Sequence, residues 1–187
     1  MLRLEPEATP ISGVFQLRRS VHRDTRGSFG RAFCAAELLA IGWMWPVAQV
    51  NISSTVSAGT VRGLHFQRPP FADMKVITCV RGEVWDVVVD LRAGSPTFLQ
   101  WYAAPLSAVG GQSMLVPPGC AHGFQTLSDD VDLVYCHSAA YSPSAEDAVR
   151  FDDPLLNIPW PVPVRNVSDR DLAHPPIMPD FQPVVVA

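Results

Sequence analysis

Two of the five histidines lie in short segments that combine a strand-like pattern with small residues. His65 lies within residues 62–67 and His122 within residues 117–124. An imidazole has an ordinary pKa of about 6.5, so it can take up or release a proton near neutral pH. A strand histidine taken alone is more often a hydrogen-bonded core residue than a catalyst. The remaining histidines are His22, His137 and His174.

The segment from Gly111 to His122 resembles the second cupin motif in its spacing of glycine, proline and histidine. Metal-binding cupins combine this motif with an HxH element on an earlier strand. That element is missing, because no second histidine lies two positions from His65. A firm transition-metal site needs three or more ligands. The pattern therefore favours the barrel and predicts neither a metal nor another cofactor.

The elements that would position these side chains are short strands separated by turns. Val, Ile and aromatic residues fill them, and Gly and Pro interrupt them. Many short strands at this spacing indicate a sandwich, a jelly roll or a barrel. The expected strands cover residues 49–54, 59–66, 74–81, 83–91, 98–104, 113–116, 121–126 and 133–138.

Three other segments have distinct patterns. Residues 83–91 alternate with apolar side chains on both faces, which predicts a central strand covered on two sides. Residues 32–41 predict a short helix with Gly42 as its C-cap. Seven prolines between Pro154 and Pro179 predict an extended tail over the barrel surface, without regular helix or central strand.

Composition limits the class of protein. The 187 residues predict one domain, and 48% apolar residues can form a substantial core. The net charge of −4, with no run of Lys or Arg, argues against nucleic-acid binding. No segment has the pattern of a signal peptide, and no apolar run is long enough to cross a bilayer. We therefore expect a cytoplasmic protein with no membrane partner.

Several segments, in order along residues 12–172, carry a more specific signal. The chain resembles the dTDP-4-dehydrorhamnose 3,5-epimerase family in these segments, above all in its RGLHFQ and PGCAHGF sequences. The resemblance implies an all-β jelly-roll (cupin) barrel over residues 1–187, a nucleotide-diphosphate sugar as substrate, and a homodimer with exchange of the N-terminal segment. It also implies epimerisation at C3, C5 or both, without metal or cofactor, in deoxysugar biosynthesis. The matching segments are residues 24–27, 49–51, 61–67, 82–90, 95–98, 118–124, 141–143, 152–155 and 168–171.

The family's roles carry over onto matching positions. The resemblance implies that His65 is the base, Asp171 its carboxylate partner and Tyr135 the acid on the opposite face. Lys75 would lie near the sugar, and Tyr141 would stack on the nucleotide base. The further substrate-binding positions would be Arg26, Gln49, Asn51, Arg62, His122, Glu146 and Arg170.

The proposed chemistry accounts for these residue types. The proton to be removed lies α to the C4 ketone, and a histidine suits that removal near neutral pH. Asp171 would fix the tautomer of His65, and Lys75 would stabilise the enolate oxygen. Strict strand alternation would place Arg62 and His65 on opposite faces, so we expect Gly63 to mark a bulge or sharp twist.

The chain departs from the family pattern at Arg31, where the family usually has Glu, at Val50, and at the pair Ala139–Ala140. The charge reversal at Arg31 leaves the nucleotide or its pose open. Two rival functions also stay open. They are a ketoisomerase on a related nucleotide sugar and a non-catalytic cupin that binds sugar nucleotides.

Overall fold

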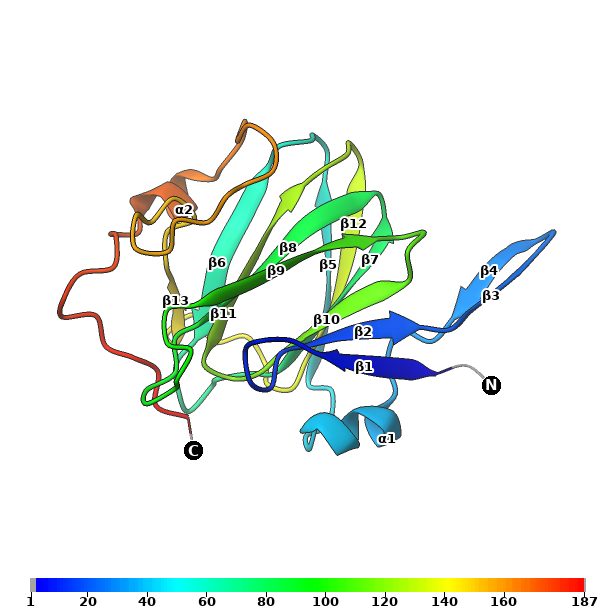
Figure 1. The fold of residues 1–187 in the computed structure, drawn as a ribbon, viewed down its shortest axis with the longest axis horizontal. Coiled ribbons are helices and arrows are strands. Elements are labelled where there is room, and N and C mark those ends of the chain that lie inside the picture. Colours follow the sequence, from blue (N-terminus) through cyan, green and yellow to red (C-terminus); the bar gives the residue numbers. More distant parts are fainter. Residues whose placement is uncertain (1–2, 187) are drawn as a thin grey trace.

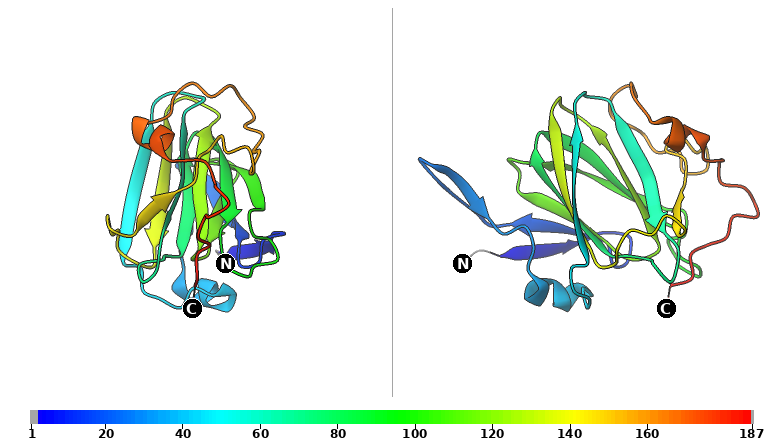
Figure 2. Two further views of the ribbon diagram at one scale, coloured as in Figure 1. Left: turned by 90° about the vertical axis from the view of Figure 1, so that its left-hand side faces the viewer. Right: turned by 180° about the vertical axis from the view of Figure 1, so that it is seen from behind.

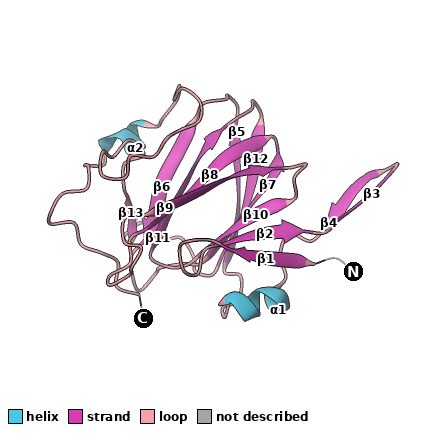
Figure 3. Ribbon diagram, viewed as in Figure 1, coloured by secondary structure: helices cyan, strands magenta, loops and turns pink. Residues whose placement is uncertain are grey.

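The computed structural model describes residues 3–186, and these residues form mostly antiparallel β-strands (Figures 1 and 3). The all-β prediction is therefore confirmed. The strands are β1 (Leu4–Ala8), β2 (Phe15–Arg19), β3 (Val21–Asp24), β4 (Gly27–Gly30), β5 (Gln49–Thr55), β6 (Val61–Gln67), β7 (Lys75–Arg81), β8 (Glu83–Asp90), β9 (Trp101–Ser107), β10 (Gln112–Val116), β11 (Cys120–Thr126), β12 (Val131–His137) and β13 (Glu146–Ala148).

Two larger sheets face each other (Figure 2). One has the strand order β1-β2-β10-β7-β12-β5, and the other has the order β13-β6-β11-β8-β9. A buried cluster joins them, with Ile77 and Leu133 from the first sheet and Val84, Val88 and Phe124 from the second. Burial of these side chains is the main stabilising contribution to the pairing of the sheets.

Strand β8 is covered on both faces, as the sequence predicts. Val84 and Val88 belong to the cluster between the sheets. Val87 and Val89 belong to a second cluster on the outer face, which includes Leu156 and other apolar residues of the C-terminal region. The C-terminal region thus packs against the outer face of the five-stranded sheet.

Residues 3–48 contain a hairpin and a short helical segment. Strands β3 and β4 form a hairpin that projects from the body of the molecule (Figure 1). Within the predicted helical region lie α1 (Ala35–Leu38) and a single 3-10 turn (Leu39–Ile41). Gly42 ends the turn with φ of 102°, a left-handed conformation that favours glycine.

The C-terminal region departs from the prediction of a tail without helix. Helix α2 (Asp169–Ala173) lies between Pro163 and Pro175, in a stretch that has no proline. The Ser168 hydroxyl caps it by accepting a hydrogen bond from the Asp171 backbone N–H at 3.1 Å. The seven prolines surround this helix and do not interrupt it, so the prediction is wrong at this point.

Gly63 marks the predicted irregularity of β6. Against β11, His65 pairs with His122 and Arg62 pairs with Phe124, so β6 has one residue more than its neighbour over this interval. Gly63 has φ of +126°, and a Cβ there would lie 2.6 Å from Cα of Gly123. The bulge brings the side chains of both Arg62 and His65 to the same cavity.

No helix within residues 3–186 is long and apolar enough to cross a membrane.

Candidate active site

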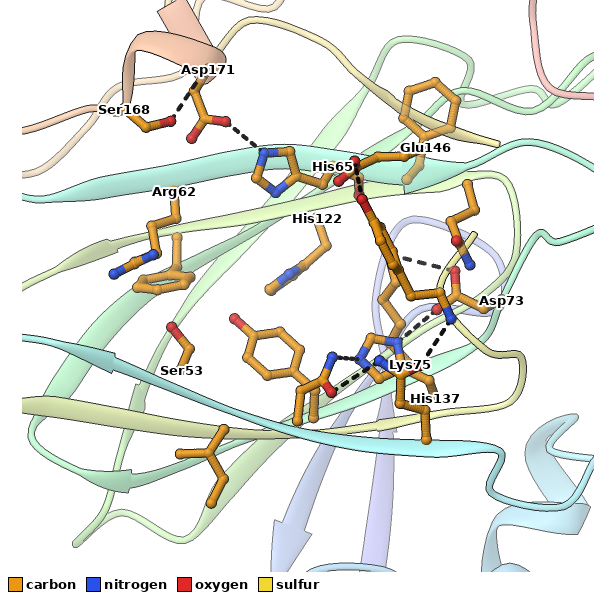
Figure 4. Close-up of a pocket in the computed structure, with 18 of the residues that line it drawn as sticks. Ser53, Arg62, His65, Asp73, Lys75, His122, His137, Glu146, Ser168 and Asp171 are labelled. Carbon is orange, nitrogen blue, oxygen red and sulfur yellow. Dashed lines mark hydrogen bonds and ion pairs between the residues drawn. The ribbon is translucent and has the colours of Figure 1, made fainter. Parts of the chain in front are cut away.

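A cavity of about 1180 Å³ opens between the two sheets, and side chains from both sheets and from α2 line it (Figure 4). It brings together eleven of the twelve residues that the sequence predicts for the site. They are Gln49, Asn51, Arg62, His65, Lys75, His122, Tyr135, Tyr141, Glu146, Arg170 and Asp171.

The predicted pair of His65 and Asp171 is present. Nε2 of His65 lies 2.7 Å from Oδ1 of Asp171, and the other ring nitrogen faces the cavity (Figure 4). The second carboxylate oxygen accepts a hydrogen bond from the Gly63 backbone N–H at 3.3 Å. Burial alone would raise the pKa of Asp171, but the hydrogen bond and charge of His65, together with hydrogen bonds to Gly63 and Ser168, outweigh it and lower the pKa. An anionic Asp171 suits the orientation of a base.

Tyr135 lies on β12, in the sheet opposite the one that holds His65. Its ring stacks on that of His137 and meets that of His122 edge to face, with centroid distances of 5.9 Å and 5.8 Å. Burial, together with the charge of Asp86, raises the pKa of Tyr135 well above its ordinary value. The phenol therefore stays protonated near neutral pH, as a proton donor must.

Lys75 reaches the cavity beside a carboxylate that the sequence analysis did not predict. Its ammonium nitrogen lies 3.6 Å from Oδ1 of Asp73, and the other oxygen of Asp73 lies 2.8 Å from Nδ1 of His137. Lys75 also lies 3.5 Å from the backbone oxygen of His65. Asp73 thus links a lysine and a histidine that both line the cavity.

His122 is held by a third carboxylate. Its Nε2 lies 2.7 Å from Oδ1 of Asp86, and both side chains are buried. Burial raises the pKa of Asp86, and the opposing charge of His122 only partly offsets it. The other oxygen of Asp86 has no hydrogen-bond partner within the described residues.

One side of the cavity has a network of polar side chains around Tyr141. The Tyr141 hydroxyl donates to Glu146 at 2.7 Å, and Glu146 forms an ion pair with Arg170. The amide oxygen of Gln49 accepts from the Tyr141 backbone N–H at 2.9 Å. The network holds Tyr141, a residue that is 49% exposed, and its aromatic ring is a suitable surface for stacking on a planar base.

Arg62 and Arg26 occupy different places relative to the cavity. Arg62 donates to the Thr55 hydroxyl at 3.0 Å and keeps its guanidinium at the cavity. Arg26 is the one predicted site residue outside the cavity lining, because it lies in the β3–β4 turn and pairs with Asp24 there. Arg31 forms an ion pair with Glu37 of α1.

Asp73, Asp86 and His137 were not predicted from the sequence. A signal was present for His137, because it lies two positions after Tyr135 on β12 and residues two apart on a strand share a face. Asp73 gave no such signal because it lies before β7 begins, and Asp86 gave none because its partner His122 lies 36 positions away.

Across residues 3–186, no three His, Cys, Asp or Glu side chains are grouped to hold a metal ion. Independence from metal stays a prediction.

Comparison with known proteins identifies the family of the chain. A sequence model of the family described as dTDP-4-dehydrorhamnose 3,5-epimerase matches residues 8–178. The chain belongs to this family of sugar-nucleotide epimerases.

Individual relatives are similar over most of their length. An enzyme named dTDP-4-dehydrorhamnose 3,5-epimerase from Mycobacterium tuberculosis is 39% identical, with 88% of this chain and 83% of the relative covered. A dTDP-4-dehydrorhamnose 3-epimerase from Streptomyces niveus is 40% identical, with 91% and 81% covered. The crystal structure of the Bacillus anthracis 3,5-epimerase, with TDP and pyrophosphate bound, has a TM-score of 0.89 at 37% identity and covers 94% of this chain and 100% of that one.

Proposed function

We propose that this protein epimerises a dTDP-4-keto-6-deoxyhexose at C3, C5 or both. The observation that carries the proposal is one cavity with a carboxylate-held histidine on one wall and a protonated tyrosine on the other. His65 removes the proton α to the ketone, and Tyr135 returns one to the opposite face. Lys75 stabilises the enolate oxygen between these steps.

The remaining site residues bind the nucleotide part of the substrate. The exposed ring of Tyr141 stacks on the base, and Gln49, Glu146 and Arg170 hold that ring and its surroundings. The cations Arg62 and Arg170 attract the diphosphate. Asn51 and His122 contact the sugar. The relative from Bacillus anthracis, which binds TDP, supports this assignment.

The protein works as a homodimer whose β3–β4 hairpin reaches into the cavity of the partner. The hairpin projects from its own barrel, and the guanidinium of Arg26 at its tip is 86% exposed. Val50 and Ile52 on edge strand β5 are 57% and 73% exposed, an apolar surface that a second copy would cover. The fold is a single jelly-roll cupin domain, and we expect the enzyme to act in the cytoplasm.

The direct test is incubation with dTDP-4-keto-6-deoxyglucose in deuterated buffer, with NMR detection of label at C3 and C5. Label and inverted product at one or both carbons support the proposal and show which centres react. A product in which the carbonyl has moved to a neighbouring carbon would favour a ketoisomerase. Substrate that binds and takes up no deuterium would show a non-catalytic binding protein.

A further inference from the structure

A second histidine–carboxylate pair faces the cavity, beside the pair of His65 and Asp171. Nδ1 of His137 lies 2.8 Å from Oδ2 of Asp73. The two pairs are built alike, since Asp73 and Asp171 are 2% and 5% exposed while their imidazoles are 15% and 35% exposed. In each pair, a nearly buried carboxylate holds a ring that stays open to the cavity.

The two pairs lie on opposite walls. His137 ends β12 in the six-stranded sheet, whereas His65 lies on β6 in the five-stranded sheet. Figure 4 shows the two imidazoles on opposite sides of the cavity. His137 therefore shares its wall with Tyr135, two positions earlier on the same strand, and with Lys75, its partner in the β7–β12 register.

One nitrogen of His137 is free to act on a bound molecule. Asp73 takes Nδ1, and the remaining contact of Nε2 within the described residues is with Nδ2 of Asn51 at 3.5 Å. That distance is at the limit of a hydrogen bond. A carboxylate on one ring nitrogen fixes the tautomer and supports the charged imidazolium, so it prepares the other nitrogen to donate a proton.

Asp73 is suited to supporting a proton-donating imidazole. Its burial alone would raise its pKa, but Lys75 and His137 outweigh the burial and keep the pKa below its ordinary value. The carboxylate is therefore anionic and lies beside both side chains. The phenol of Tyr135, whose pKa burial raises, releases a proton less readily than an imidazolium, whose ordinary pKa is about 6.5.

We propose that His137, held by Asp73, is a second proton donor on the wall that carries Tyr135. This inference rests on the epimerase function proposed above. The free nitrogen of His65 accepts the proton α to the ketone, and the electron pair of that C–H bond moves into an enolate with its charge on the C4 oxygen. The His137 imidazolium then gives its Nε2 proton to the opposite face of the carbon, where the enolate electron pair forms the new C–H bond and the ketone re-forms. Protonated His65 and neutral His137 return to their starting states by proton exchange with solvent.

Two substitutions separate proton donation from packing. His137→Asn keeps a donor for Asp73 but loses the ring, whereas His137→Phe keeps the stack on Tyr135 but loses both nitrogens. Both remove Nε2. Tyr135 still donates in both single variants, so the effect of His137 is measured in a Tyr135→Phe background. There we expect either substitution at His137 to lower the remaining net epimerisation by a further factor of about 10², with KM changed less than about threefold, while deuterium uptake from solvent continues.

The measurements are NMR of deuterium uptake and product formation, with thermal unfolding as a check on folding. Net epimerisation that is equal in Tyr135→Phe and in either double variant overturns the inference, because the shared loss of Nε2 would then be harmless. A joint loss of uptake and conversion with a lowered unfolding temperature also overturns it, since that result shows a structural role. Wild-type protein that takes up no deuterium overturns the proposed function as well. Active wild type, together with double variants that match Tyr135→Phe, overturns the second donor alone.

Discussion

The imidazole of His65 and the carboxylate of Asp171 form a hydrogen bond of 2.7 Å between residues 106 positions apart in the chain. The same carboxylate also accepts from the backbone N–H of Gly63, in the bulge that turns His65 toward the cavity. Asp171 therefore links His65 to the bulge in strand β6. Because Asp171 belongs to helix α2, this helix fixes the orientation of the imidazole.

Asp171→Asn should slow proton abstraction by about 10²-fold or more. The amide has one accepting oxygen, whereas Asp171 accepts from both His65 and Gly63, so the NH₂ group must oppose one donor. The imidazolium also loses its anionic partner. The measurement is the rate of deuterium uptake, with Asp169→Asn as a control on an exposed position of the same helix. Equal rates in both variants would exclude an orienting role.

Tyr135→Phe should lower net epimerisation by about 10²–10⁴-fold while deuterium uptake persists. If the phenol donates to the face opposite His65, as we propose, its removal affects the return of the proton and not its abstraction. His65→Asn should abolish both processes. Epimerisation at the wild-type rate in Tyr135→Phe would mean that another group carries the donation.

Gly63→Ala should lower the free energy of unfolding by about 3 kcal/mol and abolish activity. The new Cβ would meet the backbone of Gly123 at 2.6 Å and adopt φ of +126°. Gly94→Ala is the matched control, because Gly94 also has positive φ, +73°, but nothing lies within 4 Å. We expect a cost of about 1 kcal/mol there, from the backbone alone. Chemical denaturation measures the loss in free energy of unfolding for each variant. Equal losses would contradict the argument that the new Cβ at position 63 meets Gly123.

Co-expression of Arg26→Ala with His65→Asn should restore activity that each variant lacks alone. If the hairpin of one protomer completes the cavity of its partner, the mixed dimer has one site with both residues intact. Random pairing then gives about a quarter of the wild-type activity. A mixture as inactive as its components would show that Arg26 acts within its own protomer or has no part in binding.

Asp90→Asn should destabilise the protein by about 2 kcal/mol at neutral pH. Burial alone would raise the pKa of Asp90, but hydrogen bonds from Arg92, Ser95 and Thr97 lower it to about 2. Because the folded pKa lies below the unfolded value of about 3.9, the stabilisation is full above that value and is lost as the pH falls toward 2. The free energies of unfolding of the wild type and of Asp90→Asn, measured between pH 7 and pH 2, should converge as the pH falls. A difference that stays constant across this range would contradict the lowered pKa of Asp90.

The strands between residues 49 and 137 could be predicted because their apolar alternation is regular. Strands β1 to β4 and β13 could not, because they are short and mostly polar at the surface. Helix α2 was missed because prolines on either side of it outweighed the capping signal of Ser168.

Family resemblance located the residues of the cavity, but it contained no information on Asp73 or His137. Their pairing spans 64 positions, and neither lies in a segment with a recognisable motif. Such a contact depends on the register between β7 and β12, which strand periodicity alone does not fix. Alternation along β12 would still have placed His137 on the face of Tyr135.

The position of Asp171 near the end of the chain has a consequence during protein synthesis. A ribosome that has released residues 1–137 has supplied all the strands that pair in the six-stranded sheet, together with His65 and Tyr135. The nascent polypeptide still lacks the carboxylate that orients the imidazole and the apolar segments that cover β8. The strands of the six-stranded sheet are therefore available for pairing before the base has its partner. Translation that stops short of residue 171 leaves His65 without its carboxylate and the outer face of β8 without part of its apolar cover.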